Sequence, residues 1–530
     1  MALFSGIQLA NQFIHQLPAD HETAAFPRLV EKCAFSFVNP TRVSKPSLVA
    51  IEDDLALSLG FSREDMAGQE FTQLFSGNKL LDGMQPFAMC YGGHQFGQWA
   101  GQLGDGRAIN LAEIQTPKHG RKILQLKGAG LTPYSRTADG LAVLRSSIRE
   151  FLCSEAMYHL GIPTTRALTL CLTGEQVWRD MFYDGNGAYE PGAIVCRVSS
   201  SFTRFGTFQL PAKRGDLDLL TRLVDYTITN DFPHLGKPSK EVYIAWFNEV
   251  CQRTCELIVH WMRVGFVHGV MNTDNMSILG ETIDYGPYGW IDDFNLHWTP
   301  NTTDAQGKRY RFGDQGQISQ WNLFQLANAI YPLIQDAAPL QKAIDDYAEL
   351  YHGKWLKMMS AKLGLGSFQA DTDTELIQSL EDLLGQVETD MTIFFRRLAM
   401  LPVDVAVTKN NLWLDYLSDS YYQADQLGSD YLNAMSTWLA GYIERLIDEN
   451  ADFERRKQSM DSVNPKYVLR NYLAQQAIDL AHQGDFSMLR QLQQVLRKPY
   501  DEQPDYQHLA GKRPDWARHK AGCSMLSCSS

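Results

Sequence analysis

The stretch that decides the fold is HGVMNTDN, residues 268–275, which is followed by DYGP beginning at Asp284. Asp274, Asn275 and Asp284 supply carboxylate and amide oxygens, the ligands that hard cations such as Mg²⁺ and Mn²⁺ prefer. The structural alternative is an Asx-rich turn, because Asn and Asp side chains readily hydrogen-bond to nearby backbone. The stretch alone therefore predicts either a metal and phosphate site or a well-capped loop.

The spacing of these residues favours the first interpretation. A kinase catalytic loop reads H-x-D-x-x-x-x-N and is followed by D-F-G, with the Asn and the second Asp holding metal. His268 and Asn275 have this separation, and Asp284 begins a D-x-G segment. The position of the kinase catalytic Asp is filled by Val270, which cannot accept a proton. The stretch therefore predicts a kinase-like site without the usual acceptor Asp.

A Lys and a Glu upstream add to this pattern. KILQLKG (122–128) alternates like a strand, so that Lys127 shares a face with Ile123 and Gln125. A helix is expected over 146–161, opened by a Ser N-cap, with Glu150 lying off its apolar stripe. This order is typical of a phosphate-binding Lys that is held by a helix Glu. An unrelated surface Lys and Glu are the alternative.

Glycine and arginine motifs lie on either side of this pair. The run 91–107 is rich in Gly and could cradle phosphate or simply connect strands, while GDGR (104–107) is typical of a hairpin turn and would place Arg107 at a strand mouth. Arg197 and Arg204 could converge on one phosphate through forked hydrogen bonds, or could pair with surface carboxylates.

The order of these patterns along the chain predicts an α+β, protein-kinase-like bilobal fold. The text through 192–210 is strand-rich, 243–265 is helical, and nearly everything beyond about residue 318 is helical. We expect four regions: an N-terminal extension packing on the small lobe (1–90), a strand-rich small lobe (91–210), a helical large lobe (211–360) and a helical C-terminal region (361–530).

Composition narrows the class of protein. The 530 residues carry a formal charge of −13, which argues against nucleic acid as a partner, and 44% of them are hydrophobic, enough for a large core. We expect no membrane segment and no secretion signal, and therefore a cytoplasmic protein. Seven scattered cysteines fit buried free thiols, whereas Cys523 and Cys528 lie in a polar tail where we expect accessible, redox-active thiols.

Longer motifs resemble one known family. GQLGDGRA, LQLKGAGLTPYSRTADG, SSIREFL, HGVMNTDNMSI, DYGPYGWIDDF and the CSS tail are similar to those of the selenoprotein O family, from about residue 20 onwards. The resemblance implies a kinase-like pseudokinase fold that uses Mg²⁺ or Mn²⁺ and transfers AMP from ATP to protein hydroxyls, with UMP from UTP as a variant reaction. In that family a C-terminal cysteine can pair with one just beyond the D-x-G segment. This chain has no Cys between Cys255 and Cys523.

The resemblance also implies roles for individual residues. Asp274 would accept the proton of the attacking hydroxyl, Asn275 and Asp284 would bind the metal, and Glu150 would hold Lys127. The nucleotide would contact Gly104, Gly106, Arg107, Lys127, Asp139, Gly140, Arg197, Arg204 and Asp284.

Two other functions remain open from the residues themselves. The first is a divergent kinase that transfers the γ-phosphate, against which Val270 counts. The second is a non-catalytic nucleotide-binding scaffold, which would leave the Lys, Asn and Asp residues unexplained.

Overall fold

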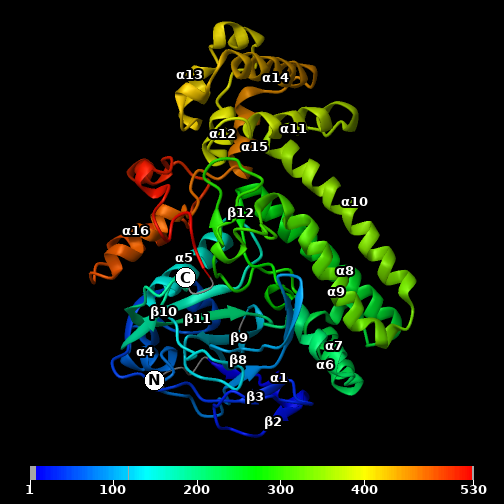
Figure 1. Ribbon diagram of the computed structural model, residues 1–530, viewed down its shortest axis with the longest axis vertical. Helices are drawn as coiled ribbons and strands as arrows, with labels where there is room; N and C mark the ends of the chain where they lie inside the picture. Colours follow the sequence, from blue (N-terminus) through cyan, green and yellow to red (C-terminus); the bar gives the residue numbers. More distant parts are fainter. Residues whose placement is uncertain (1–6, 117, 528–530) are drawn as a thin grey trace.

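Alternating side chains along strand β9 (Gly120–Lys127) divide the core into two layers. Ile123 packs in one hydrophobic cluster, whereas Leu124 and Leu126 pack in a second cluster on the opposite face. The alternation that the sequence predicts is confirmed, but the face of Gln125 and Lys127 is buried as well. The computed structural model describes residues 7–116 and 118–527, and shows an α+β protein with a strand-rich N-terminal part and a helical remainder (Figure 1).

Within the described residues, nine strands form one large sheet in the order β2-β3-β5-β8-β9-β11-β10-β4, with β1 paired to β8. Its strands are β1 (Gln8–Leu9), β2 (Ala19–Asp20), β3 (Phe35–Phe37), β4 (Ser47–Ile51), β5 (Phe87–Met89), β8 (Ala108–Thr116), β9, β10 (Arg166–Arg179) and β11 (Ala188–Ser199). Residues before position 90 therefore contribute strands to the sheet itself.

Two short strands, β6 (Gly92–Gln95) and β7 (Gln98–Gln102), pair with each other outside the large sheet. This hairpin contains most of the glycine-rich run. The expectation of a hairpin turn at GDGR is wrong, because β7 pairs with β6 and β8 pairs with β9. A last pair joins β12 (Phe266–Val267) to β13 (Gly289–Trp290), and encloses the chain segment that decides the fold.

Helices cover both faces of the large sheet. Helices α2 (Asp53–Leu59), α3 (Arg63–Ala67) and α4 (Gln69–Phe75) pack on the face of Leu124 and Leu126, and α5 (Leu144–His159) packs on the face of Ile123. Helix α5 begins two residues before the Ser at 146 that the sequence suggested as its N-cap, and Val143 holds the cap position. It is buried on nearly all sides rather than along one stripe.

The remaining helices follow the sheet in the chain. They are α6 (Phe205–Arg214), α7 (Leu217–Asp231), α8 (Lys240–Val264), α9 (Gln315–Ile334), α10 (Ala337–Lys362), α11 (Ala370–Leu384), α12 (Met391–Leu398), α13 (Leu414–Leu417), α14 (Ser429–Asp448), α15 (Phe453–Val463), α16 (Asn471–Ala481) and α17 (Ser487–Val495), with the short α1 (Gln12–Gln16) near the N-terminus. The prediction of strands through 192–210 is wrong at its C-terminal end, because β11 ends at Ser199 and α6 begins at Phe205.

The helical part and the sheet share one hydrophobic core, which runs from Phe13 to Cys523. In Figure 1, α11 to α15 lie at the end of the molecule away from the sheet, whereas α16 returns beside α5. Gln493 of α17 donates a hydrogen bond of 2.6 Å to the Glu52 carboxylate. This bond joins α17, in the C-terminal region, to the N-terminal part of the chain. Helix α17 therefore contacts the segment that precedes α2.

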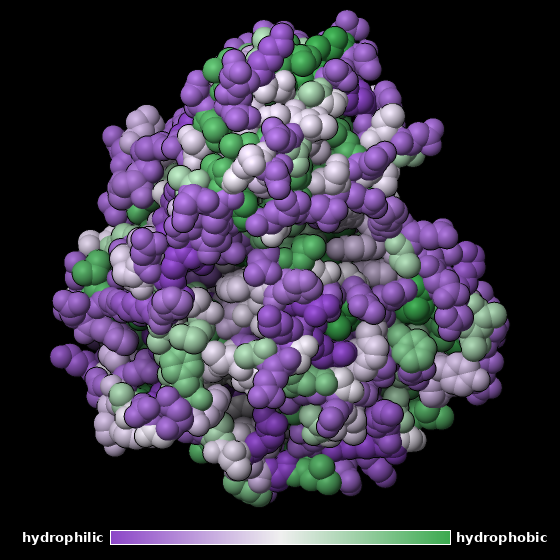
Figure 2. All heavy atoms as spheres, turned by 45° about the horizontal axis from the view of Figure 1, so that its top comes forward, coloured by the Kyte–Doolittle hydropathy of each residue, from purple (hydrophilic) through white to green (hydrophobic). Residues whose placement is uncertain are grey.

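The surface in Figure 2 is mostly hydrophilic, with hydrophobic side chains in small groups. Within residues 7–116 and 118–527, no helix combines the length and the apolar character that crossing a lipid bilayer requires.

Candidate active site

A cleft of about 640 Å³ collects the residues that the sequence singled out. Its walls come from the turn before β8, the end of β9, the loop 134–141, β11, the start of α6 and the loop 270–287. The expected site residues that line it are Gly104, Gly106, Arg107, Lys127, Asp139, Gly140, Arg197, Arg204, Asp274, Asn275 and Asp284. Glu150 lies behind this wall, in contact with Lys127.

Lys127 and Glu150 form an ion pair at the inner end of the cleft. Lys127 ends β9, and α5 presents Glu150 toward it from the covering layer. Glu150 also accepts a hydrogen bond of 3.1 Å from Arg197. Burial lowers the pKa of Lys127 to about 8, although the Glu150 carboxylate opposes this shift. The pair therefore presents a desolvated ammonium to the cleft.

Asp284 lies where two arginines converge. Its Oδ1 accepts a hydrogen bond of 2.5 Å from Arg197, and its Oδ2 contacts Arg204. Burial opposes ionisation, but Arg204, Arg197 and Lys127 outweigh burial and hold the Asp284 pKa well below its usual range. The backbone at Asp284 is left-handed, with φ of 58°, a conformation that few residues other than Gly, Asn and Asp adopt. Asp284 is thus an ionised carboxylate that lines the cleft.

Asp274 sits in a different environment. Its side chain is 8% exposed, and its Oδ2 accepts a hydrogen bond of 3.1 Å from Gln95 in the β6–β7 hairpin. Among the described residues, Oδ1 is buried without any hydrogen-bond partner. Burial raises the pKa of Asp274 to about 6. A carboxylate with a free oxygen and a pKa just below neutrality is suited to accept a proton.

Val270 and Asn275 define the other side of this site. The Asn275 side-chain amide donates a hydrogen bond of 2.9 Å to the Val270 carbonyl, which leaves the Asn275 oxygen without a partner among described residues. Nearby, His268 is buried and its Nε2 lies 2.9 Å from the Ile283 carbonyl, so it fixes the chain just before Asp284. His268 therefore has a structural contact, and Asn275 is free to act as an oxygen ligand.

The donor set fits a divalent cation that is completed by phosphate and water. The Asn275 oxygen and the Asp284 carboxylate are hard ligands on one wall of the cleft. Over the described residues no cluster of three or more His, Cys, Asp or Glu side chains is arranged to hold a metal by itself. Two protein ligands are typical of Mg²⁺ in phosphoryl-transfer sites, where substrate oxygens supply others.

Three of the glycines that line the cleft leave no room for a side chain. Gly104 and Gly106 lie before β8, and a β-carbon on Gly106 would lie 2.8 Å from the Tyr134 carbonyl. Gly140, at φ of 73°, packs so closely that a β-carbon would lie 2.2 Å from the Gly130 carbonyl. Most of the glycine-rich run 91–107 forms the β6–β7 hairpin, and this hairpin contacts Asp274.

Asp139 lies at the rim of the cleft, where both of its oxygens accept hydrogen bonds from Arg179, at 2.7 and 2.9 Å. The sequence did not single out Arg179, nor the exposed Trp178 and Tyr183 that line the same rim. These residues belong to β10 and the loop that follows it. Nothing in their local pattern separates them from an ordinary exposed strand end.

Asp105 is a further residue that the sequence reasoning missed. It lies within GDGR, is 1% exposed, lines the cleft, and has a carboxylate oxygen 3.8 Å from the Arg204 guanidinium. An Asp between two glycines reads as a turn residue, so its burial could not be anticipated.

The expectation of accessible tail thiols is wrong for Cys523, which is 2% exposed and whose pKa is raised to about 11 by burial. The tail folds back into the structure, and Leu526 donates a backbone hydrogen bond of 2.9 Å to Pro300. Cys528 lies outside the described residues. The other cysteines are free thiols, buried except for the half-buried Cys33.

Comparison with known proteins places every one of these cleft residues inside a matched region. A family model described as protein adenylyltransferase SelO matches residues 18–497. A Rhodopirellula baltica protein named protein nucleotidyltransferase YdiU is 56% identical over 532 residues, covering 98% of both chains. Proteins of the same name from an Azoarcus species and from Flavobacterium johnsoniae are 56% and 52% identical, over 98% and 99% of this chain and 99% of each relative.

Proposed function

The chain belongs to the protein adenylyltransferase SelO family, and on that premise we propose that its cleft transfers AMP from ATP to Ser, Thr or Tyr hydroxyls of proteins, releasing pyrophosphate. The general activity, protein nucleotidyl transfer, is that of the family. The donor nucleotide, the acceptor side chains and the roles of individual residues are our proposal. UTP, donating UMP, is the alternative donor.

We assign a protein-kinase-like bilobal arrangement to the fold, with the regions 1–90, 91–210, 211–360 and 361–530. Two features support it: α5 presents Glu150 to Lys127 at the end of a strand, and the Asp274 and Asp284 segments follow the long helix α8. A cytoplasmic location is part of the proposal, since the described cysteines are free and mostly buried.

The triphosphate would lie against Lys127, Arg197 and Arg204, with Gly104, Gly106 and Arg107 beside it and Asp139 and Gly140 at the rim. Trp178 and Tyr183 are exposed aromatic side chains on the same rim, and are suited to stack on a base. The cleft lining contains six basic and five acidic residues, so its own charge is nearly balanced. A triphosphate therefore needs further positive charge.

Asn275 and Asp284 would hold Mg²⁺ or Mn²⁺, and this ion would neutralise charge on the triphosphate and on the departing pyrophosphate. Asp284 keeps its charge because Arg197 and Arg204 stabilise it. These arginines form ion pairs with Asp284 and Glu150.

Asp274 would act as the general base. The acceptor hydroxyl gives its proton to Asp274 Oδ1 while its oxygen bonds to the α-phosphorus, and the bond from that phosphorus to the bridging oxygen of pyrophosphate breaks. Positioning and charge neutralisation carry most of the catalysis in such transfers. The observation that carries this proposal is the buried, unpartnered Oδ1 of Asp274, a residue that lines the cleft together with Val270, which offers no base.

The experiment compares ATP labelled at the α-phosphate with ATP labelled at the γ-phosphate, in separate incubations with the purified protein and a cell lysate. We expect protein-bound label and pyrophosphate from the α-labelled nucleotide, and no protein label from the γ-labelled one. Asp274→Asn should abolish transfer while nucleotide affinity stays within about threefold. Label that arrives from the γ position alone would identify a kinase, and tight nucleotide binding without any transfer would identify a scaffold.

A further inference from the structure

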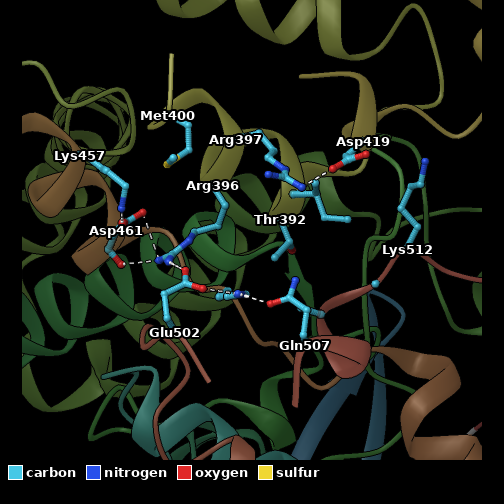
Figure 3. Close-up of a pocket in the computed structure, with 14 residues that line it drawn as sticks. Thr392, Arg396, Arg397, Met400, Asp419, Lys457, Asp461, Glu502, Gln507 and Lys512 are labelled. Carbon is cyan, nitrogen blue, oxygen red and sulfur yellow. Dashed lines mark hydrogen bonds and ion pairs between the residues drawn. The ribbon is translucent and has the colours of Figure 1, made fainter. Parts of the chain in front are cut away.

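A second cavity, of about 490 Å³, lies in the helical C-terminal region (Figure 3). It is formed by α12, by α15 and by the segment that follows α17. None of the residues that line the first cleft belongs to it. The cavity residues are Thr392, Ile393, Arg396, Arg397, Met400, Asp419, Lys457, Asp461, Lys466, Glu502, Gln507, Ala510, Gly511 and Lys512.

The charge of this cavity is opposite to that of the whole protein. Its lining contains five basic and three acidic side chains, whereas the chain carries a formal charge of −13. A local excess of positive charge on an acidic protein attracts anionic groups at short range, because screening limits the repulsion from distant charges.

Two of these basic side chains, Arg396 and Lys457, make hydrogen bonds and ion pairs within the fold. Arg396 donates hydrogen bonds to three backbone carbonyls and to Glu502, and its side chain is 11% exposed. Lys457 pairs with Asp461 at 2.6 Å within α15. These interactions tie α12 to α15 and to the C-terminal segment, so that the cavity has a fixed shape.

Arg397 and Lys512 each make one hydrogen bond to the fold, fewer than Arg396 makes. Arg397 has a side chain that is 45% exposed, and its partner Asp419 is 62% exposed on the same rim. Lys512 donates a hydrogen bond of 2.6 Å to the Tyr421 carbonyl, and no carboxylate of the described residues lies within 4.0 Å of it. In the view of Figure 3, Arg397 lies between Met400 and Lys512.

An apolar surface lies beside these two cations. Met400 is 43% exposed, and Ile393 and Ala510 are half-buried in the lining. An exposed Met is a flexible apolar contact that adapts to different side chains. Positive charge next to adaptable apolar surface suits a peptide that carries acidic and aliphatic side chains, more than it suits a small inorganic anion.

We propose that this cavity binds an acidic segment of the protein that is to be modified, and so acts as a docking site remote from the first cleft. The role as a substrate site rests on the proposed function. Lys512 is followed by Arg513, which lies 3.5 Å from Asp292 and 3.4 Å from Asp293, in the chain that continues from Asp284. The cavity is therefore held in a fixed relation to the first cleft, and a docked protein would present its hydroxyls at a raised local concentration.

The binding test uses a fluorescein-labelled peptide of alternating Glu and Leu, its Gln and Leu counterpart, and fluorescence anisotropy without nucleotide. We expect the Glu peptide to bind more tightly than the Gln peptide, and to weaken as salt is raised. The double variant Arg397→Gln and Lys512→Gln should lower the affinity about tenfold, the scale of losing two partly exposed charge contacts. The control double variant, Lys240→Gln and Lys342→Gln, removes the same charge from exposed lysines elsewhere and should bind like the wild type.

The proposal is overturned if both peptides bind equally, if the Arg397 and Lys512 variant keeps the wild-type affinity, or if inorganic phosphate binds there and the Glu peptide does not. A second readout separates this proposal from the first. Excess Glu peptide should reduce α-labelling of lysate proteins by the wild type, and should have little effect on the double variant. An enzyme that binds the peptide but labels no protein would contradict the proposed function while leaving the binding site in place.

Discussion

Gly93 and Asp274 approach each other so closely that a β-carbon on Gly93 would lie 2.5 Å from Oδ1 of Asp274. The β6–β7 hairpin thus covers the carboxylate and excludes water from it, while Gln95 of the same hairpin donates a hydrogen bond to its other oxygen. This contact explains why the Asp274 pKa is raised by burial. The contact also explains why position 93 is a glycine, because a β-carbon there would displace the Asp274 carboxylate.

Gly93→Ala should therefore impair transfer without changing any polar group. We expect kcat to fall by about one to two orders of magnitude, because small displacements of a catalytic group are costly. Nucleotide affinity should stay near the wild-type value, since Gly93 does not line the cleft. Gly353→Ala is the matched control, because a β-carbon there meets no atom within 4 Å. Equal activity of the Gly93 and Gly353 variants would disprove the role of this contact.

The acid limb of the pH profile should report Asp274. Its pKa is raised to about 6, so the proton-accepting carboxylate form is lost as the pH falls below that value. We expect kcat/KM to drop about tenfold per pH unit below about pH 6. Gln95→Leu removes the hydrogen bond that stabilises the carboxylate, so it should move this limb to higher pH. A profile that is flat from pH 5 to 8 would argue against Asp274 as the base.

Asp284 should be required for rate more than for folding. Asp284→Ala removes one of the two proposed metal ligands and leaves Arg197 and Arg204 without their shared carboxylate. We expect transfer to fall by roughly two to three orders of magnitude, the scale of losing a strong charge-stabilising group. The assay needs saturating Mg²⁺ and, separately, Mn²⁺, with thermal unfolding as a control for stability. Activity within about threefold of wild type under either ion would refute the metal assignment.

The sequence predicted the local features of this site better than its long-range contacts. The alternation of side chains in 122–128 placed Lys127 on one face of a strand, and the spacing from His268 to Asp284 identified the D-x-G segment. Both patterns are local, because each lies within one short segment of the chain. The contact of Gly93 with Asp274 joins segments that are distant in the chain, so no local pattern records it. The prediction that Cys523 is accessible failed for a related reason. A polar tail sequence indicates exposure, but burial depends on what the tail packs against.

The alkaline limb of the pH profile of kcat/KM should report the loss of the Lys127 proton. A shift of this limb on substitution of Glu150 tests the ion pair between the two residues. Burial lowers the Lys127 pKa to about 8, so the ammonium that would hold phosphate loses its proton as the pH rises through this value. The Glu150 carboxylate raises that pKa, which means that Glu150→Gln should lower it further and move the limb below pH 8. The variant should therefore lose more kcat/KM at pH 8 than at pH 7. Glu256→Gln, on the exposed side of α8, removes the same charge and should leave the limb in place. An alkaline limb that does not move in the Glu150 variant would show that this carboxylate does not control Lys127.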